Sequence, residues 1–99
     1  MEHHVYFWLR PEHQHAADRV AFEAGMGKLF EIKQVAGGMW GRPAPVMQRP
    51  VIDASWDYAI SMRFDSVAAQ DLYQADPAHL AFVERFKDWW ARVLVMDVE

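Results

Sequence analysis

The clearest pattern in the chain is an alternation of large apolar residues with small or polar residues over Trp56–Phe64. A period of two is typical of a strand with one buried face. Two further segments, His4–Arg10 and Arg92–Val98, are apolar on both faces. Val35–Gly41 is a shorter candidate strand, in which Gly37–Gly38 indicates a bulge. The pattern therefore predicts four strands.

Three helices are predicted between these strands. Apolar residues fall at helical spacing in Ala17–Gln34. Ser66 is a suitable N-cap for a short helix over Val67–Gln74, and Asp76 is one for a helix over Pro77–Trp90. The order of elements is then strand, helix, strand, strand, helix, helix, strand. This order predicts an α+β ferredoxin-like sandwich with a four-stranded antiparallel sheet.

The doubly apolar strand His4–Arg10 has to be covered on both faces. The predicted helices can cover one face, and a second copy of the chain is the simplest cover for the other. We therefore predict a homodimer formed sheet against sheet. Asp57 and Arg63 lie on the face predicted for the interface, where they are candidates for pairing across it. The loop Arg42–Ser55 is long enough to reach across a partner subunit.

Composition narrows the classes of function. The chain is 53% hydrophobic and 14% aromatic, which indicates an interface or a ligand cavity in addition to a small core. A net charge of −4 with scattered basic residues argues against nucleic acid as a partner. No apolar run is long enough for a membrane span and the N-terminus lacks a signal-peptide layout, so we expect no membrane partner and a cytoplasmic location. The absence of cysteine excludes disulfides and thiolate catalysis, and residues 1–99 are expected to form one domain.

Two side chains with proton chemistry flank the sharp corner at Asp76-Pro77. His79 lies in the first turn of a predicted helix, where the helix dipole disfavours the imidazolium and keeps the ring neutral. With Tyr73 donating a hydrogen bond to a carbonyl, the pair can stabilise an enolate, as aldol, enolisation or lyase chemistry requires. The alternative is structural. In that interpretation His79 bonds a backbone group that closes the corner, and Tyr73 caps the core.

The other histidines carry weaker signals. His4 shares a strand face with Tyr6 and Trp8, so it is either a second base in a pocket or a residue at the edge of the core. The His3-His4 pair and the His13-Gln14-His15 segment suggest a metal contact. Since the chain has no cysteine and no helical pair of histidines four residues apart, we expect no metal site. Gly37, Gly38 and Gly41 lack the spacing of a phosphate-binding loop, so we expect no nucleotide site.

Three segments resemble the stress-responsive A/B barrel family, known as Dabb. They are HVYFWLR from His4, YQADPAHLAFV from Tyr73 and WWARVLVMD from Trp89. The resemblance covers nearly the whole chain, and its most specific element is the tyrosine followed by Pro77-Ala78-His79. Members of that family are small dimeric α+β barrels in which two sheets pack face to face. The resemblance therefore implies that two sandwiches of this chain pair into a dimeric α/β barrel.

The resemblance also implies a site. The Dabb family includes plant polyketide cyclases, the olivetolic acid cyclases, which close a ring by an intramolecular aldol condensation without metal or cofactor. Similarity to them implies that Tyr73 and His79 are catalytic and that His4 lines the pocket with them. The other pocket residues implied in this way are Tyr6, Trp8, Phe22, Ile60, Met62, Phe82, Trp90 and Val93.

This chain departs from those cyclases at several positions, and its pocket candidates Trp8 and Tyr6 are bulkier than their aliphatic residues. Asp76 replaces a histidine and Gly25 stands where they have a tyrosine, so their substrate is not transferred. The implied function is binding of a small hydrophobic or aromatic ligand in an apolar pocket, with cofactor-free acid/base chemistry of the cyclase, isomerase or lyase kind. The alternative is a non-catalytic, stress-associated binding or structural homodimer.

Overall fold

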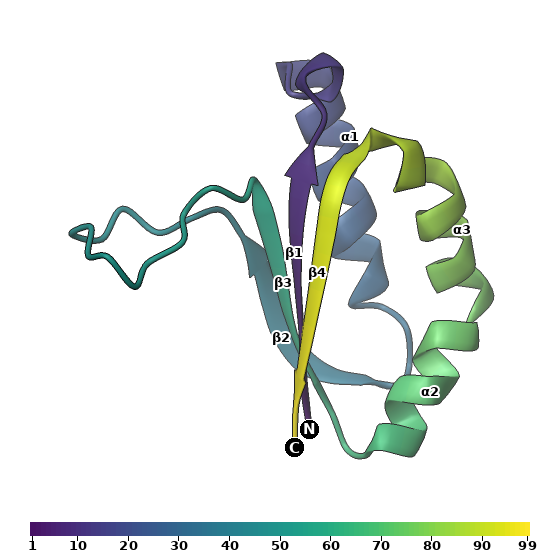
Figure 1. The fold of residues 1–99 in the computed structure, drawn as a ribbon. Coiled ribbons are helices and arrows are strands. Elements are labelled where there is room, and N and C mark those ends of the chain that lie inside the picture. The colour runs from purple at the N-terminus through teal and green to yellow at the C-terminus, as the bar shows by residue number, and fades with distance from the viewer.

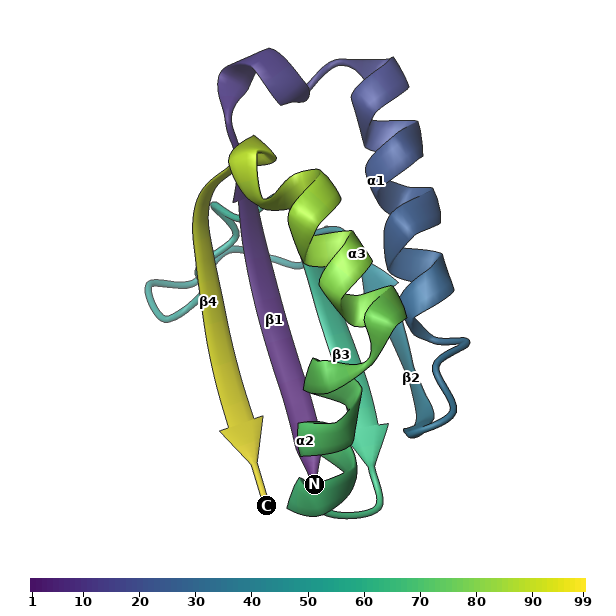
Figure 2. The same ribbon diagram turned by 90° about the vertical axis from the view of Figure 1, so that its right-hand side faces the viewer.

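Four strands form the sheet of this computed structural model, which describes every residue from Met1 to Glu99. They are β1 (Glu2–Leu9), β2 (Val35–Gly41), β3 (Tyr58–Phe64) and β4 (Trp90–Val98). All neighbouring strands are antiparallel, in the order β2-β3-β1-β4 (Figure 1). The predicted α+β ferredoxin-like sandwich with a four-stranded antiparallel sheet is therefore confirmed. The two chain termini lie side by side at one end of the sheet, because β1 and β4 are neighbours (Figure 2).

Helices cover one face of the sheet, as Figure 2 shows. They are α1 (Ala16–Leu29), α2 (Val67–Ala75) and α3 (Pro77–Phe86). The predicted caps of α2 and α3 are confirmed, because the Ser66 hydroxyl accepts from the Ala69 amide at 3.0 Å and the Asp76 carboxylate accepts from the Ala78 amide at 2.8 Å. None of the helices combines the length and the apolar character that a membrane crossing needs.

Two helix ends differ from the predicted ends by more than one residue. Helix α1 stops at Leu29 rather than Gln34, because the chain tightens there: the Phe30 and Glu31 amides donate to carbonyls only three residues back. Helix α3 stops at Phe86, and a 3₁₀ turn over Lys87–Trp89 follows it. These short turns lead the chain into β2 and β4, the strands at the two edges of the sheet.

The hydrophobic core lies between the sheet and the helices. In β1 the residues that share a face with Val5 point into it, and in β3 those that share a face with Tyr58 do. The fourteen buried apolar residues are Val5, Phe7, Leu9, Phe22, Met26, Leu29, Ile32, Tyr58, Ile60, Met62, Phe64, Tyr73, Phe82 and Phe86. Helices α1 and α3 pack closely, because a Cβ placed on Gly25 would lie 2.5 Å from the Phe86 ring. The glycine that interrupts the predicted helix therefore permits this contact.

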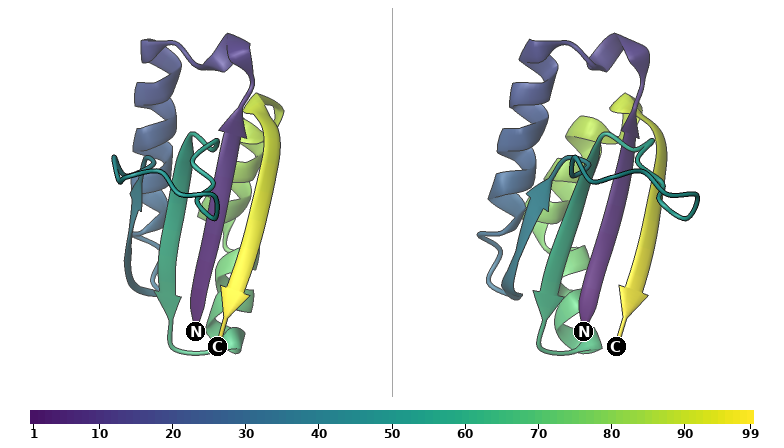
Figure 3. Two further views of the ribbon diagram at one scale, coloured as in Figure 1. Left: turned by 60° about the vertical axis from the view of Figure 1, so that its left-hand side comes forward. Right: turned by 90° about the vertical axis from the view of Figure 1, so that its left-hand side faces the viewer.

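The opposite face of the sheet carries no helix (Figure 3). The loop between β2 and β3 projects from this side of the molecule (Figure 1). Trp56, predicted to share a face with Tyr58, instead contacts Tyr6, with ring centroids 5.3 Å apart. This part of the prediction was wrong because β3 begins only at Tyr58, so the alternation does not extend back to Trp56.

Asp57 is already satisfied within its own chain. Its carboxylate accepts from the Leu9 amide at 2.7 Å and from the Arg19 guanidinium at 3.1 Å. Arg63 donates to the Ala36 carbonyl at 3.2 Å. Both side chains therefore make contacts inside one subunit, and their pairing across an interface stays a prediction.

Candidate functional site

The corner between α2 and α3 brings Tyr73 and His79 together. Asp76 has extended backbone, with φ −64° and ψ 135°, so it ends α2 and caps α3 in one residue. Pro77 fixes the first position of α3. As a result, the Tyr73 and His79 rings lie 4.7 Å apart between centroids, at an angle of 53°. Tyr73 is buried, with 2% of its surface exposed.

The hydrogen bonding of His79 defines which nitrogen can act as a base. Its Nδ1 lies 3.1 Å from the Gln74 carbonyl oxygen. Since a carbonyl oxygen only accepts, Nδ1 carries the proton and donates it. In the neutral ring the lone pair is then on Nε2. The ring is held by the backbone of α2, and Nε2 makes no hydrogen bond within the chain.

Burial sets the protonation states of both side chains. It lowers the pKa of His79 below the ordinary value, and the neighbouring His3 lowers that pKa further, while the Gln74 carbonyl and Asp76 act in the opposite direction. Burial alone raises the pKa of Tyr73 well above its ordinary value. Near neutral pH the imidazole is therefore an unprotonated base and the phenol is a protonated hydrogen-bond donor.

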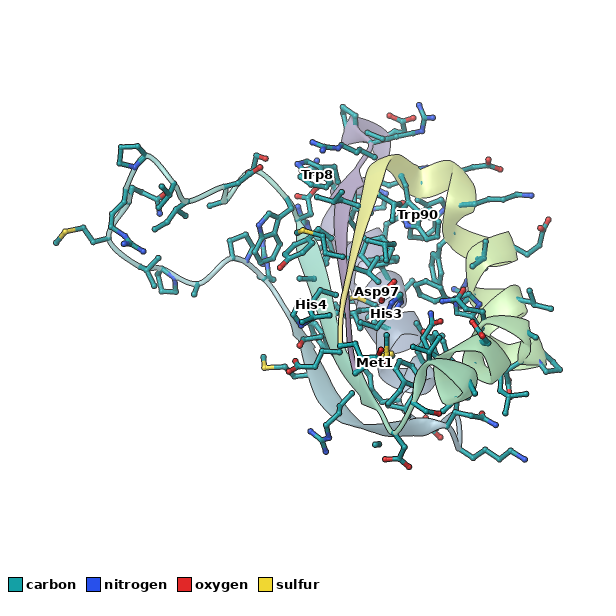
Figure 4. All side chains as sticks on the ribbon, turned by 60° about the horizontal axis from the view of Figure 1, so that its bottom comes forward. Met1, His3, His4, Trp8, Trp90 and Asp97 are labelled. Carbon is teal, nitrogen blue, oxygen red and sulfur yellow. The ribbon has the colours of Figure 1, made fainter.

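The strand histidine beside this pair is His3 rather than His4. His3 is buried, its ring centroid lies 6.1 Å from that of Tyr73, and its Nδ1 lies 2.5 Å from a carboxylate oxygen of Asp97 on β4. His4 lies on the other face, as Figure 4 shows, with its Nε2 3.2 Å from Glu2. The placement of His4 in the pocket is therefore corrected, because successive residues of a strand point to opposite faces.

A cavity of about 180 Å³ opens between the sheet and α3 beside these side chains. Tyr73 and His79 both line it, as do four of the eight implied pocket residues, namely Ile60, Phe82, Trp90 and Val93. Further lining residues that the sequence did not indicate are His3, Val5, Phe7, Leu29, Gln74, Val83 and Val95.

The other four implied residues are elsewhere. Phe22 and Met62 are fully buried in the core and do not line the cavity. Tyr6 and Trp8 share the face of His4, where they border a separate hollow with Trp56. The strand β1 is apolar on both faces, so its composition does not show which face is inside. The shared parity of His3 and Val5 was the one signal that pointed to His3.

The histidines near the start of α1 serve a different purpose. His13 and His15 both approach one carboxylate oxygen of Asp18, at 2.8 and 3.0 Å. The His13 ring also stacks on Trp89, with centroids 4.6 Å apart. No group of three or more histidine, cysteine or acidic side chains is placed to hold a metal ion. These histidines therefore fasten the turn before α1 to the rest of the fold.

The lowered pKa of His79 predicts a pH-dependent stability. The unfolded chain, in which the pKa of histidine is near its ordinary 6.5, binds the proton more tightly than the folded chain. The stabilising contribution is therefore complete above that value and is lost as the pH falls toward the lowered folded pKa. We expect acidification from about pH 7 to about pH 5 to lower the Tm of the wild type more than that of His79→Gln.

His15→Gln is the matched control for this experiment, because the His15 side chain is 59% exposed. Its Tm should follow that of the wild type across the range. Parallel curves for the wild type and His79→Gln would show that folding does not shift the protonation of His79.

The sheet order and the one-sided helical layer define a ferredoxin-like α+β protein, and the apolar cavity with a histidine and a tyrosine places a candidate site between the layers. The chain belongs to the Dabb family: the family model described as the stress responsive A/B barrel domain matches residues 1–99. Among curated proteins, no sequence matches the chain.

Three solved structures illustrate the likeness. A Dabb family protein with a ferredoxin-like fold from Mesorhizobium loti is 28% identical, with a TM-score of 0.79, and the match covers 99% of this chain and 93% of the other. A hydroxynitrile lyase from Passiflora edulis is 20% identical, with a TM-score of 0.76 and coverage of 96% and 87%. A dimeric ferredoxin-like protein from Jannaschia sp. is 20% identical, with a TM-score of 0.74 and coverage of 99% and 96%.

Proposed function

We propose that this protein binds a small, uncharged aromatic or apolar carbonyl compound and catalyses cofactor-free proton transfer at the carbon next to the carbonyl. The observation that carries the proposal is that one apolar cavity is lined by both Tyr73 and His79. No lysine, arginine or carboxylate lines that cavity. An uncharged ligand therefore matches it better than an ion does.

The chemistry uses one base and one donor. The Nε2 atom of His79 removes a proton from the carbon next to the carbonyl, which leaves an imidazolium and an enolate. The Tyr73 hydroxyl donates a hydrogen bond to the enolate oxygen and stabilises its charge. The imidazolium then returns the proton to carbon or passes it to a leaving or accepting group. Cyclisation, isomerisation and lyase reactions share this first step.

Two observations, in addition to the Tyr73–His79 pair, support a role in proton transfer. The short contact between His3 and Asp97 holds the His3 ring in place beside Tyr73, where both residues line the cavity. In addition, the fold carries a named enzyme activity in one neighbour, the hydroxynitrile lyase from Passiflora edulis. That likeness supports the idea that this fold can hold an enzyme active site. The reaction proposed here rests on the cavity of this chain.

A second candidate is a non-catalytic binding or structural protein. It is favoured by the bond from His79 Nδ1 to the Gln74 carbonyl, which closes the corner between α2 and α3. In that case Tyr73 and His79 contribute to folding, and the cavity binds a ligand without changing it or binds none.

Acetophenone is a suitable probe, because it is a small aromatic ketone with exchangeable protons next to its carbonyl. In D2O the enzyme hypothesis expects the protein to accelerate loss of the methyl proton signal. Binding without acceleration, seen as chemical shift changes at residues lining the cavity, would favour the non-catalytic candidate. Absence of both effects would overturn the proposed ligand class.

We also propose that the helix-free face of the sheet is covered by a second copy of the chain, which would give the dimeric barrel. Side chains on this face, including Tyr6, Trp8 and Leu94, border an apolar hollow. The dimeric neighbour from Jannaschia sp. supports pairing within this fold. A cytoplasmic location for the homodimer remains a prediction.

Leu94→Lys tests the proposed dimer. Leu94 lies opposite Tyr6 in the β1–β4 ladder, on the helix-free face, so a lysine there would place a charge within the proposed interface. We expect sedimentation to show a dimer for the wild type and a monomer for this variant at micromolar concentration. Leu72→Lys is the control, because Leu72 is an exposed residue of α2, on the helical side. A wild-type monomer would contradict the proposal.

A further inference from the structure

A second hollow lies between α1 and α3, at the surface of the helical layer. Figure 2 shows the two helices side by side, and the hollow between them has a volume of about 230 Å³. Gly25 of α1 and Ala78 and Ala81 of α3 line it. These small residues leave open the space that longer side chains would fill. We call this hollow the α1–α3 groove.

The floor of the α1–α3 groove is apolar. It is formed by Leu29, Phe82 and Phe86, which line the groove and are otherwise buried in the core. Leu29 and Phe82 also line the cavity that Tyr73 and His79 share, so these two side chains separate the groove from that cavity. A short alkyl chain or a single ring placed on this floor is removed from water, which favours its binding.

The rim of the α1–α3 groove is cationic. Lys28 of α1 and Arg85 of α3 are exposed and line it, and no acidic residue does. Neither cation forms an ion pair within the chain, although Lys28 also borders a hollow with Glu31 and Asp76. The Arg85 guanidinium lies 4.8 Å from the centroid of the Phe86 ring, which holds it beside the floor. In a chain of net charge −4, this rim is a local site for an anion.

We propose that the α1–α3 groove is a second binding site, which takes a small apolar carboxylic acid in its ionised form, such as hexanoate. The alkyl chain lies on the apolar floor, and the carboxylate accepts hydrogen bonds from Lys28 and Arg85 at the rim. An inorganic anion would leave the floor exposed to water, and a neutral alcohol would leave both cations unpaired. The cavity beside Tyr73 and His79 is lined by no cation, so the two sites select ligands of different charge.

Hexanoate and 1-hexanol test the role of the rim, because they share an alkyl chain and differ in charge. In NMR titrations of the wild type, we expect hexanoate to shift the amide signals of Gly25 and Ala81 and to bind roughly three- to tenfold more tightly than hexanol, as two solvent-exposed charge contacts allow. The double variant Lys28→Gln/Arg85→Gln should lose this preference and keep its affinity for hexanol. Lys87→Gln is the control, because Lys87 lies outside the groove and pairs with Glu84.

Ala81→Trp tests the place of binding. Ala81 is exposed, so its indole would fill the groove without entering the core, and the variant should no longer bind hexanoate. Leu80→Trp should bind as the wild type does, because Leu80 is an exposed residue of α3 outside the groove.

Three results would overturn the proposal. They are a wild type that does not bind hexanoate, binding that persists unchanged in Ala81→Trp, and a preference for hexanoate over hexanol that is absent in the wild type or survives in the double variant. None of these results depends on catalysis at Tyr73 and His79, so the proposed function is tested separately.

Discussion

His79→Ala is expected to slow the exchange of the acetophenone methyl protons by about 10²- to 10⁴-fold, the range that a positioned base contributes. The Nε2 atom is the only nitrogen of this ring that its backbone bond leaves free, so no other atom of His79 can take the proton. Tyr73→Phe keeps the ring in the core and removes the hydroxyl. Its effect should be about 10²- to 10³-fold, as for loss of one donor to a developing oxyanion. Exchange followed by proton NMR in D2O measures both.

Two further measurements give this prediction its specificity. The His4→Gln variant should catalyse exchange of the acetophenone methyl protons at nearly the wild-type rate, because His4 lies on the face of the sheet away from the cavity. The Tm of each variant shows whether the corner is a structural support. A large loss of stability in both His79→Ala and Tyr73→Phe, with exchange rates that scale with the folded fraction, would show that both residues act as structural supports and would overturn their catalytic roles.

Gly38→Ala is expected to destabilise the fold more than any other single methyl addition at a glycine. Gly38 has a φ of +134°, a backbone conformation that residues other than glycine rarely adopt. In addition, a Cβ at this position would lie 2.0 Å from the Ser61 carbonyl oxygen. That oxygen belongs to the backbone of β3, so it cannot rotate away. We expect a loss of about 3 kcal/mol, which lowers the Tm by roughly 15 °C.

Gly27→Ala is the matched control for this substitution. Gly27 lies within α1 and nothing lies within 4 Å of the added Cβ. The alanine should therefore stabilise the protein by about 0.5–1 kcal/mol through its higher helix propensity. Thermal unfolding of the two variants beside the wild type measures both effects. Similar Tm values for Gly38→Ala and the wild type would mean that β2 relaxes around the new Cβ without cost.

The fold was predictable because its signals are local. Ser66 and Asp76 each begin a helix through their own side chains. The alternation over Tyr58–Phe64 requires one buried face wherever that strand is placed. Such patterns depend on neighbours within a few residues, so a sequence shows them directly. The Asp76-Pro77 corner is of this kind, and it brings Tyr73 and His79 close together in the structure.

The set of residues that line the cavity was less predictable, because it depends on contacts between segments far apart in the sequence. His3 reaches the cavity by facing Asp97, which lies 94 residues further along the chain. Trp90 reaches it through a shift of register between β1 and β4. Phe22 and Met62 have the same apolar character as the residues that line the cavity, yet the surrounding core encloses them completely. Composition cannot separate these cases.

By itself the sequence determined the order of strands and helices, the helix caps and the corner that pairs Tyr73 with His79, because periodicity, capping and proline geometry act over short stretches of chain. Only the tertiary structure decided that His3 rather than His4 lies beside that pair, and that Trp90 is among the residues that line the cavity. When a strand is apolar on both faces, its composition does not show which face packs into the core. The helices and the neighbouring strand that pack against it determine which face is buried.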